Sequence, residues 1–127
     1  MIEVTCAIIT KDDKFLITQR GEDMPHPLQW EFPGGKLKAG ESPESCIIRE
    51  IKEELGIRVD VDRLLPSVVH NYGNQSIRLI PFICSMRDEK ILLQQHKDLR
   101  WIRSDETGDF DILDADLKII ARLQGKF

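Results

Sequence analysis

The sequence has few of the features that mark membrane, secreted or polymer-binding proteins. No apolar run approaches the roughly 20 residues that cross a bilayer, and no basic segment precedes the apolar residues at the N-terminus, so we expect no membrane partner and no signal peptide. A net charge of −4 disfavours a surface for nucleic acid polymers. The three cysteines lack C-x-x-C spacing and suit small buried thiols. Together these absences favour a cytoplasmic protein.

Linkers, internal repeats and low-complexity stretches are also missing. The 127 residues can bury one hydrophobic core but hardly two. We therefore predict a single domain over residues 1–127. Nothing in the sequence indicates the oligomeric state.

What the sequence does contain is a group of glutamates at helical spacing. Glu50, Glu53 and Glu54 stand at i, i+3 and i+4, which places them on one face of a helix. Like charges this close repel each other, whereas hard cations such as Mg²⁺ prefer clustered oxygen ligands. Taken alone, the spacing suits a solvated acidic face at least as well. Together with the glycines before it and with Glu41 and Arg49, it indicates a metal site.

The helix that carries these glutamates has clear ends. Ser42 is a suitable N-cap, Pro43 follows at the first helical position, and Gly56 stands where a left-handed residue usually ends a helix. An apolar stripe, centred about 120° from the glutamates, can pack against a sheet. It consists of Ile47, Ile51 and Leu55. The acidic face is then free to line a cleft.

Two consecutive glycines, Gly34 and Gly35, lie in a predicted loop before this helix. Glycine lets the backbone approach a ligand closely. A carbonyl from such a loop can complete the oxygen shell of a metal ion, and Lys36 can neutralise phosphate charge.

The segment from Gly35 to Ile57 resembles the Nudix box, G-x5-E-x7-R-E-U-x-E-E-x-G-U, in which U is aliphatic. Every specified position is filled, by Gly35, Glu41, Arg49, Glu50, Ile51, Glu53, Glu54, Gly56 and Ile57. The whole chain is similar to the small MutT-like hydrolases of this family. The resemblance implies an α/β fold, the Nudix α/β/α sandwich with a central mixed β-sheet, and hydrolysis that depends on Mg²⁺ or, as an alternative, Mn²⁺.

The resemblance also implies roles within the box. Glu50, Glu53 and Glu54 match the metal-binding carboxylates, and the carbonyl of Gly34 matches a further metal ligand. Arg49 is expected to pair with Glu41 or Glu53 and to hold it in place. Glu41 is equally suited to direct metal binding and to anchoring the loop to the helix.

Substrate-binding residues are implied as well. Arg20 matches a position that meets the triphosphate or the sugar, although a surface arginine looks the same. Asp116 matches the base-reading position, or else it is only the N-cap of the last helix. Phe32 or Trp30 is a candidate for stacking on the base, and Trp30 is equally suited to the core. Lys36 is the predicted phosphate contact.

One position departs from the MutT-like pattern. Many members carry a glutamate six residues before a late tryptophan, where this chain has Gln95. Glutamine cannot carry charge or take up a proton near neutral pH. Asp98 can substitute if the loop shifts; otherwise the base is Glu53 or Glu50. His96 is interpreted as a surface histidine, with a phosphate contact as the alternative.

The remaining pattern predicts strands and a second helix. Strands are expected at residues 2–10, 15–20, 30–32, 58–61, 68–72, 76–86 and 98–102, with a turn at residues 72–75. Helical apolar spacing covers residues 115–124. This mixture suits helices packed on a mixed sheet.

The predicted function is hydrolysis of a nucleoside triphosphate to nucleoside monophosphate and pyrophosphate by a metal-activated water. Candidate substrates are 8-oxo-dGTP and CTP- or dCTP-like nucleotides. One alternative is a Nudix-fold nucleotide-binding module with weak or no catalysis, which Gln95 motivates. Others are a hydrolase of a different nucleoside diphosphate derivative and an interaction domain with a solvated acidic helix.

Overall fold

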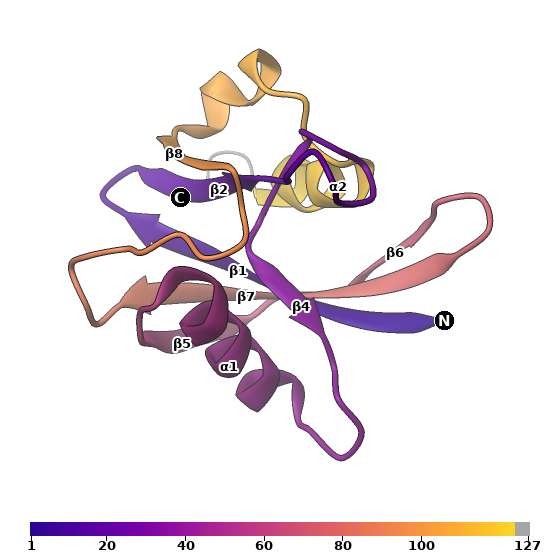
Figure 1. Cartoon of the computed structure of the whole chain (residues 1–127), viewed down its shortest axis with the longest axis horizontal. Coiled ribbons are helices and arrows are strands. Elements are labelled where there is room, and N and C mark those ends of the chain that lie inside the picture. The colour runs from indigo at the N-terminus through magenta and orange to yellow at the C-terminus, as the bar shows by residue number, and fades with distance from the viewer. Residues whose placement is uncertain (124–127) are drawn as a thin grey trace.

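The computed structural model describes residues 1–123, in which a mixed sheet is covered by helices on both faces (Figure 1). The elements follow one another as β1 (Ile2–Lys11), β2 (Lys14–Gln19), β3 (Trp30–Glu31), β4 (Gly34–Lys36), α1 (Pro43–Leu55), β5 (Val59–Leu64), β6 (Val68–Asn71), β7 (Ser76–Met86), β8 (Asp98–Ile102), a 3-10 helix (Ser104–Asp109) and α2 (Asp114–Leu123). No helix in this part of the chain is long and apolar enough to cross a membrane.

The parallel pair β1 and β7 forms the centre of the sheet. The main strand order is β3-β2-β1-β7-β5, with β4 paired to β1, β6 to β7 and β8 to β2. Every other pairing between named strands is antiparallel. The sheet is therefore mixed, as the sequence predicted.

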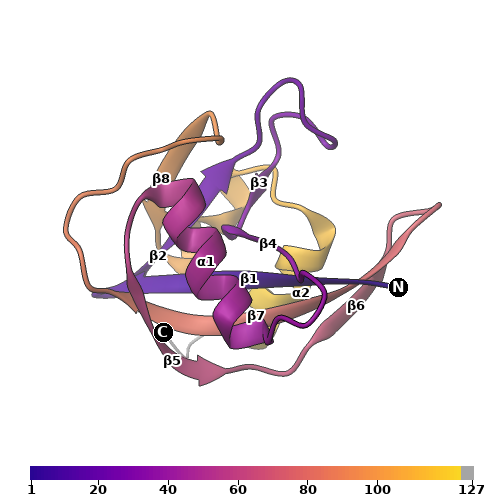
Figure 2. The ribbon, with the colours of Figure 1, turned by 60° about the horizontal axis from the view of Figure 1, so that its bottom comes forward.

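Alternating side chains of β1 supply both hydrophobic cores. Cys6 and Ile8 belong to the core beneath α2, while Ala7 and Ile9 belong to the core beneath α1. This alternation is the period-2 pattern of a strand that is buried on both faces. Figure 2 shows α1 and α2 on opposite sides of the sheet. The arrangement confirms the predicted α/β/α sandwich.

Helix α1 has the ends that its sequence predicts. The Ser42 hydroxyl accepts a hydrogen bond from the Ser45 amide at 3.1 Å, and Gly56 has a φ of 67° at the C-terminal end. The predicted apolar stripe is fully buried in the core on that side of the sheet. The opposite face carries the glutamates, so packing of α1 fixes their position.

Several boundaries differ from the predictions. Gly34–Lys36 forms strand β4 rather than a loop, because its backbone pairs with Val4–Cys6 of β1. The predicted strands at 58–61 and 68–72 are observed as Val59–Leu64 and Val68–Asn71. The 3-10 helix was not predicted. Helix α2 begins at Asp114, one residue before the predicted start, and the predicted last residue, Gln124, lies outside the described residues.

Candidate active site

A cleft of about 600 Å³ lies between Glu54, near the C-terminal end of α1, and the first turn of α2. Its walls come from β1, the segment after β2, the strands β3 and β4, the turn between β6 and β7, and the first turn of α2. Residues central to its chemistry are Arg20, Glu31, Phe32, Gly34, Glu54 and Asp116. The fold thus brings together residues that are up to 96 positions apart in the sequence, from Arg20 to Asp116.

Glu54 is the buried member of the glutamate group, with 6% of its surface exposed. Its Oε2 accepts a hydrogen bond from the Gly34 amide at 3.1 Å. Burial, together with the nearby Glu31 and Glu50 carboxylates, raises the pKa of Glu54 to about 9. A buried carboxyl group surrounded by other carboxylates lacks a positive partner, which is the environment that a divalent cation satisfies.

Glu50 lies against the backbone of Gly35. A Cβ added at Gly35 would collide with the carboxylate of Glu50, whereas a Cβ at Gly34 would collide with the backbone of Thr5 and Cys6. Glycine is therefore required at both positions, because Gly35 lies close to the Glu50 side chain and Gly34 lies close to the backbone of β1.

Arg49 binds three glutamates. Its Nε and Nη2 donate to the two carboxylate oxygens of Glu41 at 2.7 and 2.9 Å. Its Nη1 donates to Glu50 at 2.9 Å and to Glu53 at 3.2 Å. Hydrogen bonds from Arg49 lower the pKa of Glu41 to about 2. Because both Glu41 oxygens are occupied, Glu41 anchors the loop to the helix, and the predicted pairing of Arg49 is observed.

The three helix glutamates share one face but do not form a closed cage. Within residues 1–123, no three His, Cys, Asp or Glu side chains converge as a preformed metal site. The reason is that Arg49 holds Glu50 and Glu53, while Glu54 faces the Gly34 amide. The donor set consists of oxygens, which suits a hard cation such as Mg²⁺.

Asp116 lies inside the first turn of α2 rather than at its N-cap, so the N-cap alternative is wrong. The Phe32 amide donates a hydrogen bond to Asp116 Oδ2 at 2.7 Å. Burial raises the pKa of Asp116 to about 8, with a further contribution from Glu31. At neutral pH the group is therefore mostly protonated, and it lines the cleft.

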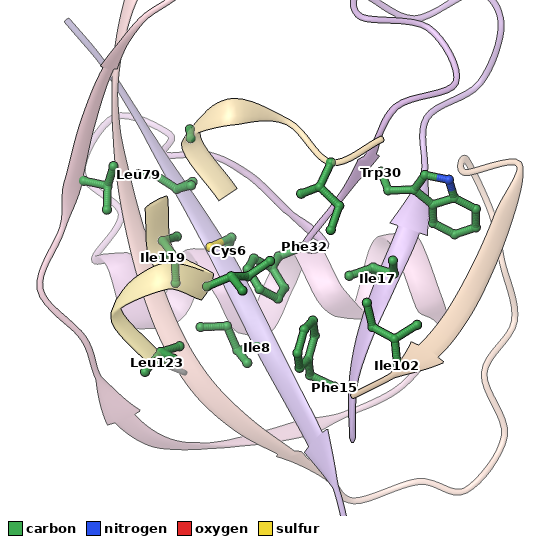
Figure 3. Close-up of a cluster of buried hydrophobic side chains, with 14 residues drawn as sticks. Cys6, Ile8, Phe15, Ile17, Trp30, Phe32, Leu79, Ile102, Ile119 and Leu123 are labelled. Atoms are coloured by element: carbon green, nitrogen blue, oxygen red, sulfur yellow. The ribbon is translucent and has the colours of Figure 1, made fainter. Parts of the chain in front are cut away.

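The aromatic rings proposed for stacking lie in the hydrophobic core (Figure 3). The Phe32 ring packs against Phe15 with centroids 5.6 Å apart, and the Trp30 ring packs edge-on against Phe110 at 5.2 Å. Trp30 is thus a core residue. Phe32 is 3% exposed, and its backbone amide provides its polar contact in the cleft.

Arg20 and Lys36 both line the cleft. Arg20 Nη1 lies 2.8 and 3.0 Å from the two carboxylate oxygens of Glu31, and its Nε donates to the Pro25 carbonyl. Its side chain is only 16% exposed, so it is not an ordinary surface arginine. Lys36 is exposed at the edge of the cleft.

The late loop differs from its predicted arrangement. Gln95 is exposed and does not line the cleft. Asp98 belongs to β8, binds Arg100 at 2.7 Å and does not line the cleft. His96 is buried and binds Glu31, so its interpretation as a surface residue is wrong.

Sequence reasoning missed other residues that line the cleft. Glu31 stands beside the glycines in the sequence, and nothing there indicated that it faces Arg20. Tyr72 accepts a hydrogen bond from the Ala115 amide at 3.0 Å, and the His26 ring lies 4.9 Å from its ring. No motif or periodicity marks His26 and Tyr72 as cleft residues, because His26 lies in the loop after β2 and Tyr72 directly follows β6.

Comparison with known proteins decides the family. The model of the NUDIX domain matches residues 1–123. The chain belongs to the NUDIX family. This membership confirms the predicted Nudix, MutT-like hydrolase and the predicted fold. Nudix enzymes typically use a divalent metal.

Individual relatives support this Nudix assignment. The CTP pyrophosphohydrolase of Escherichia coli K12 is 31% identical over 120 residues, which cover 94% of this chain and 89% of the relative. The 8-oxo-dGTP diphosphatase of Proteus vulgaris is 46% identical over 76 residues, which cover 60% of this chain and 68% of that relative. The solution structure of the E. coli ORF135 protein matches with a TM-score of 0.82 and 30% identity, over 98% of this chain and 91% of that one.

Proposed function

We propose that this protein hydrolyses a nucleoside triphosphate to nucleoside monophosphate and pyrophosphate. The observation that carries the proposal is the cleft that brings Glu54 of the acidic face together with Arg20 and Asp116. Such a cleft combines cationic groups for phosphates with a hydrogen-bonding carboxyl group. The names of the two Nudix relatives, which both describe hydrolysis of nucleoside triphosphates, support it.

Glu50, Glu53 and Glu54 are the proposed metal-holding side chains, with the Gly34 carbonyl as a further ligand. Glu54 fits this role because it is buried among other carboxylates. A bound cation would offset the repulsion between their negative charges. A bound Mg²⁺ or Mn²⁺ would offset the negative charge on the phosphates during the reaction. Arg49 would keep Glu50 and Glu53 aligned with the cleft.

The chain's own groups would perform the remaining chemistry. A water oxygen attacks the β-phosphorus, the bond from that phosphorus to the α–β bridging oxygen breaks, and the nucleoside monophosphate leaves. Glu53, which is 49% exposed, is the proposed acceptor of the proton from the water. Arg20 and Lys36 would bind the phosphate oxygens.

Asp116 is the proposed reader of the base. Ionised, it accepts a hydrogen bond from an exocyclic amino group such as cytosine N4. Protonated, as its pKa of about 8 favours at neutral pH, it donates to an acceptor such as the oxygen of an oxidised purine. The proposal therefore covers CTP- and dCTP-like nucleotides and 8-oxo-dGTP.

The test is pyrophosphate release from CTP, dCTP, 5-methyl-dCTP, 8-oxo-dGTP and the normal nucleotides, with and without Mg²⁺. We expect metal-dependent release that is at least about 10²-fold slower in Glu53→Gln. Preference for one substrate group identifies the base that Asp116 reads. Tight nucleotide binding without turnover would contradict the proposal and favour a binding module.

A further inference from the structure

His96 contacts Glu31, which lines the cleft, although it comes from the loop whose expected glutamate is absent. Its side chain is 2% exposed, and its Nε2 lies 2.9 Å from Glu31 Oε2. Within residues 1–123, its Nδ1 is buried without a hydrogen-bond partner. The neutral tautomer with hydrogen on Nε2 fits this environment, because it donates to the carboxylate and leaves no N–H unpaired.

Glu31 joins His96 to the cationic wall of the cleft. It accepts hydrogen bonds from both sides, from His96 Nε2 and from Arg20 Nη1. Arg20 is fixed further by its Nε, which donates to the Pro25 carbonyl at 2.6 Å. Among the described residues, Arg20 Nη2 has no hydrogen-bond partner that competes with a phosphate for its donors.

The backbone of the loop is tied down on both sides of His96. The Lys97 amide donates at 2.9 Å to the carbonyl of Gln19, which is the last residue of β2 and directly precedes Arg20. The Gln94 amide donates to the Glu54 carbonyl at 3.0 Å, at the end of α1. His96 is therefore held at a fixed distance from both the acidic helix and Arg20, which a flexible surface loop would not achieve.

We propose that His96 is a positioning residue: it orients Glu31 and, through Glu31, holds the guanidinium of Arg20 ready for the phosphates of the nucleotide. The late loop contributes through His96 to substrate binding, while the exposed Gln95 beside it does not line the cleft. This inference rests on the proposed function, since it concerns the binding of the same nucleoside triphosphate.

The kinetic test compares His96→Leu, which keeps the bulk but removes the donor, with His96→Gln, which keeps an N–H donor near the Nε2 position. We expect His96→Leu to raise KM for the nucleoside triphosphate about 10- to 100-fold, the range of a hydrogen bond to a charged group, with kcat changed less than about threefold. His96→Gln should recover most of the affinity. Lys97→Ala is the matched control, because within residues 1–123 the Lys97 side chain pairs with the exposed Glu22 alone and the substitution keeps its backbone amide.

A double-mutant cycle shows whether His96 acts through Glu31. In the Glu31→Gln background, adding His96→Leu should change KM little further, because the charged acceptor is already gone. Full additivity of the two changes, or a loss in kcat at unchanged KM, would overturn the proposal.

A measurement without substrate separates this inference from the proposed function. The NMR signal of the Arg20 Nε–H should shift or broaden in His96→Leu and stay in place in His96→Gln and Lys97→Ala, at matched melting temperatures. An unmoved Arg20 signal would refute the positioning role even if the enzyme hydrolyses nucleotides. A moved signal in a protein that hydrolyses none would leave the positioning contact established and refute the proposed function instead. If His96→Leu does not fold, the same signal in His96→Asn, whose amide occupies the Nδ1 rather than the Nε2 position, gives the answer.

Discussion

At the scale of single residues, Gly34 and Gly35 are adjacent yet constrained by different neighbours. Gly34 faces the backbone of β1, which cannot move without disturbing the sheet. Gly35 faces the end of the Glu50 side chain, which can swing away. A side chain at Gly34 should therefore lower stability, whereas a side chain at Gly35 should impair catalysis.

Gly34→Ala should lower the free energy of unfolding by about 2–3 kcal/mol, because the new methyl group forces β4 away from β1. Gly35→Ala should fold with nearly normal stability but lose about 10²-fold in turnover, since Glu50 is displaced from its position. Urea unfolding and pyrophosphate release measure the two effects. Gly108→Ala is the control, because that glycine faces open space. Equal destabilisation by the Gly34 and Gly35 changes would contradict this separation.

The buried carboxyl of Asp116 makes a prediction about pH. Its pKa is about 8 in the folded protein and about 4 in an unfolded chain. The folded state therefore binds more protons between these values, and the contribution of Asp116 to stability falls as the pH rises through this window, by at most about 1.4 kcal/mol per pH unit. Asp116→Asn should remove this slope, so the variant should gain stability relative to the wild type as the pH rises from 4 to 8. Urea unfolding across that range, without metal, tests it; identical pH profiles would show that the carboxyl ionises normally.

At the scale of elements, helix α1 positions the acidic face, and its ends depend on local residues. The Ser42 cap satisfies the Ser45 amide at the N-terminus, and the left-handed Gly56 ends the helix beside Leu92 of the late loop. A helix so defined at both ends cannot slide relative to the sheet.

Ser42→Ala should reduce stability by about 1 kcal/mol, because one amide at the start of the helix loses its partner. Ser42→Asp should restore most of this loss, since aspartate is also a good N-cap and its charge suits the helix dipole. Urea unfolding measures both. Equal losses in the two variants would mean that the hydroxyl acts through some other contact.

At the scale of the whole molecule, the acidic cleft is destabilised when it holds no cation. Because Glu54 has a pKa of about 9 in the folded state, folding keeps it protonated at a pH where the unfolded chain ionises it, which reduces stability between about pH 4 and 9. Binding of a cation would favour the folded state instead.

Mg²⁺ at ten times its dissociation constant should stabilise the wild type by about 1.4 kcal/mol and raise its melting temperature by about 3–6 °C. Glu54→Gln should abolish this increase and yet melt higher than the wild type without metal, because the amide cannot ionise. Thermal unfolding with NaCl at matched ionic strength is the control. A Mg²⁺ increase retained in Glu54→Gln would exclude Glu54 from the metal site.

How much the sequence predicted depends on how local each feature is. The ends of α1, the strands Ser76–Met86 and Asp98–Ile102, and the pairing of Arg49 with Glu41 and Glu53 all follow from spacing and capping, and the structure has them. The Nudix box itself is a continuous segment, so family membership was readable from it.

What the sequence alone determined about this protein is the acidic helix, its orientation toward a cleft and the family. Only the tertiary structure decided that His96 lies buried against Glu31, that Asp116 binds the Phe32 amide, and that the Phe32 and Trp30 rings belong to the core. These contacts join residues 65 and 84 positions apart. Helical periodicity relates residues that are only a few positions apart. Burial depends instead on how β1, β7 and the two helices pack against one another. That packing cannot be predicted from a short stretch of sequence.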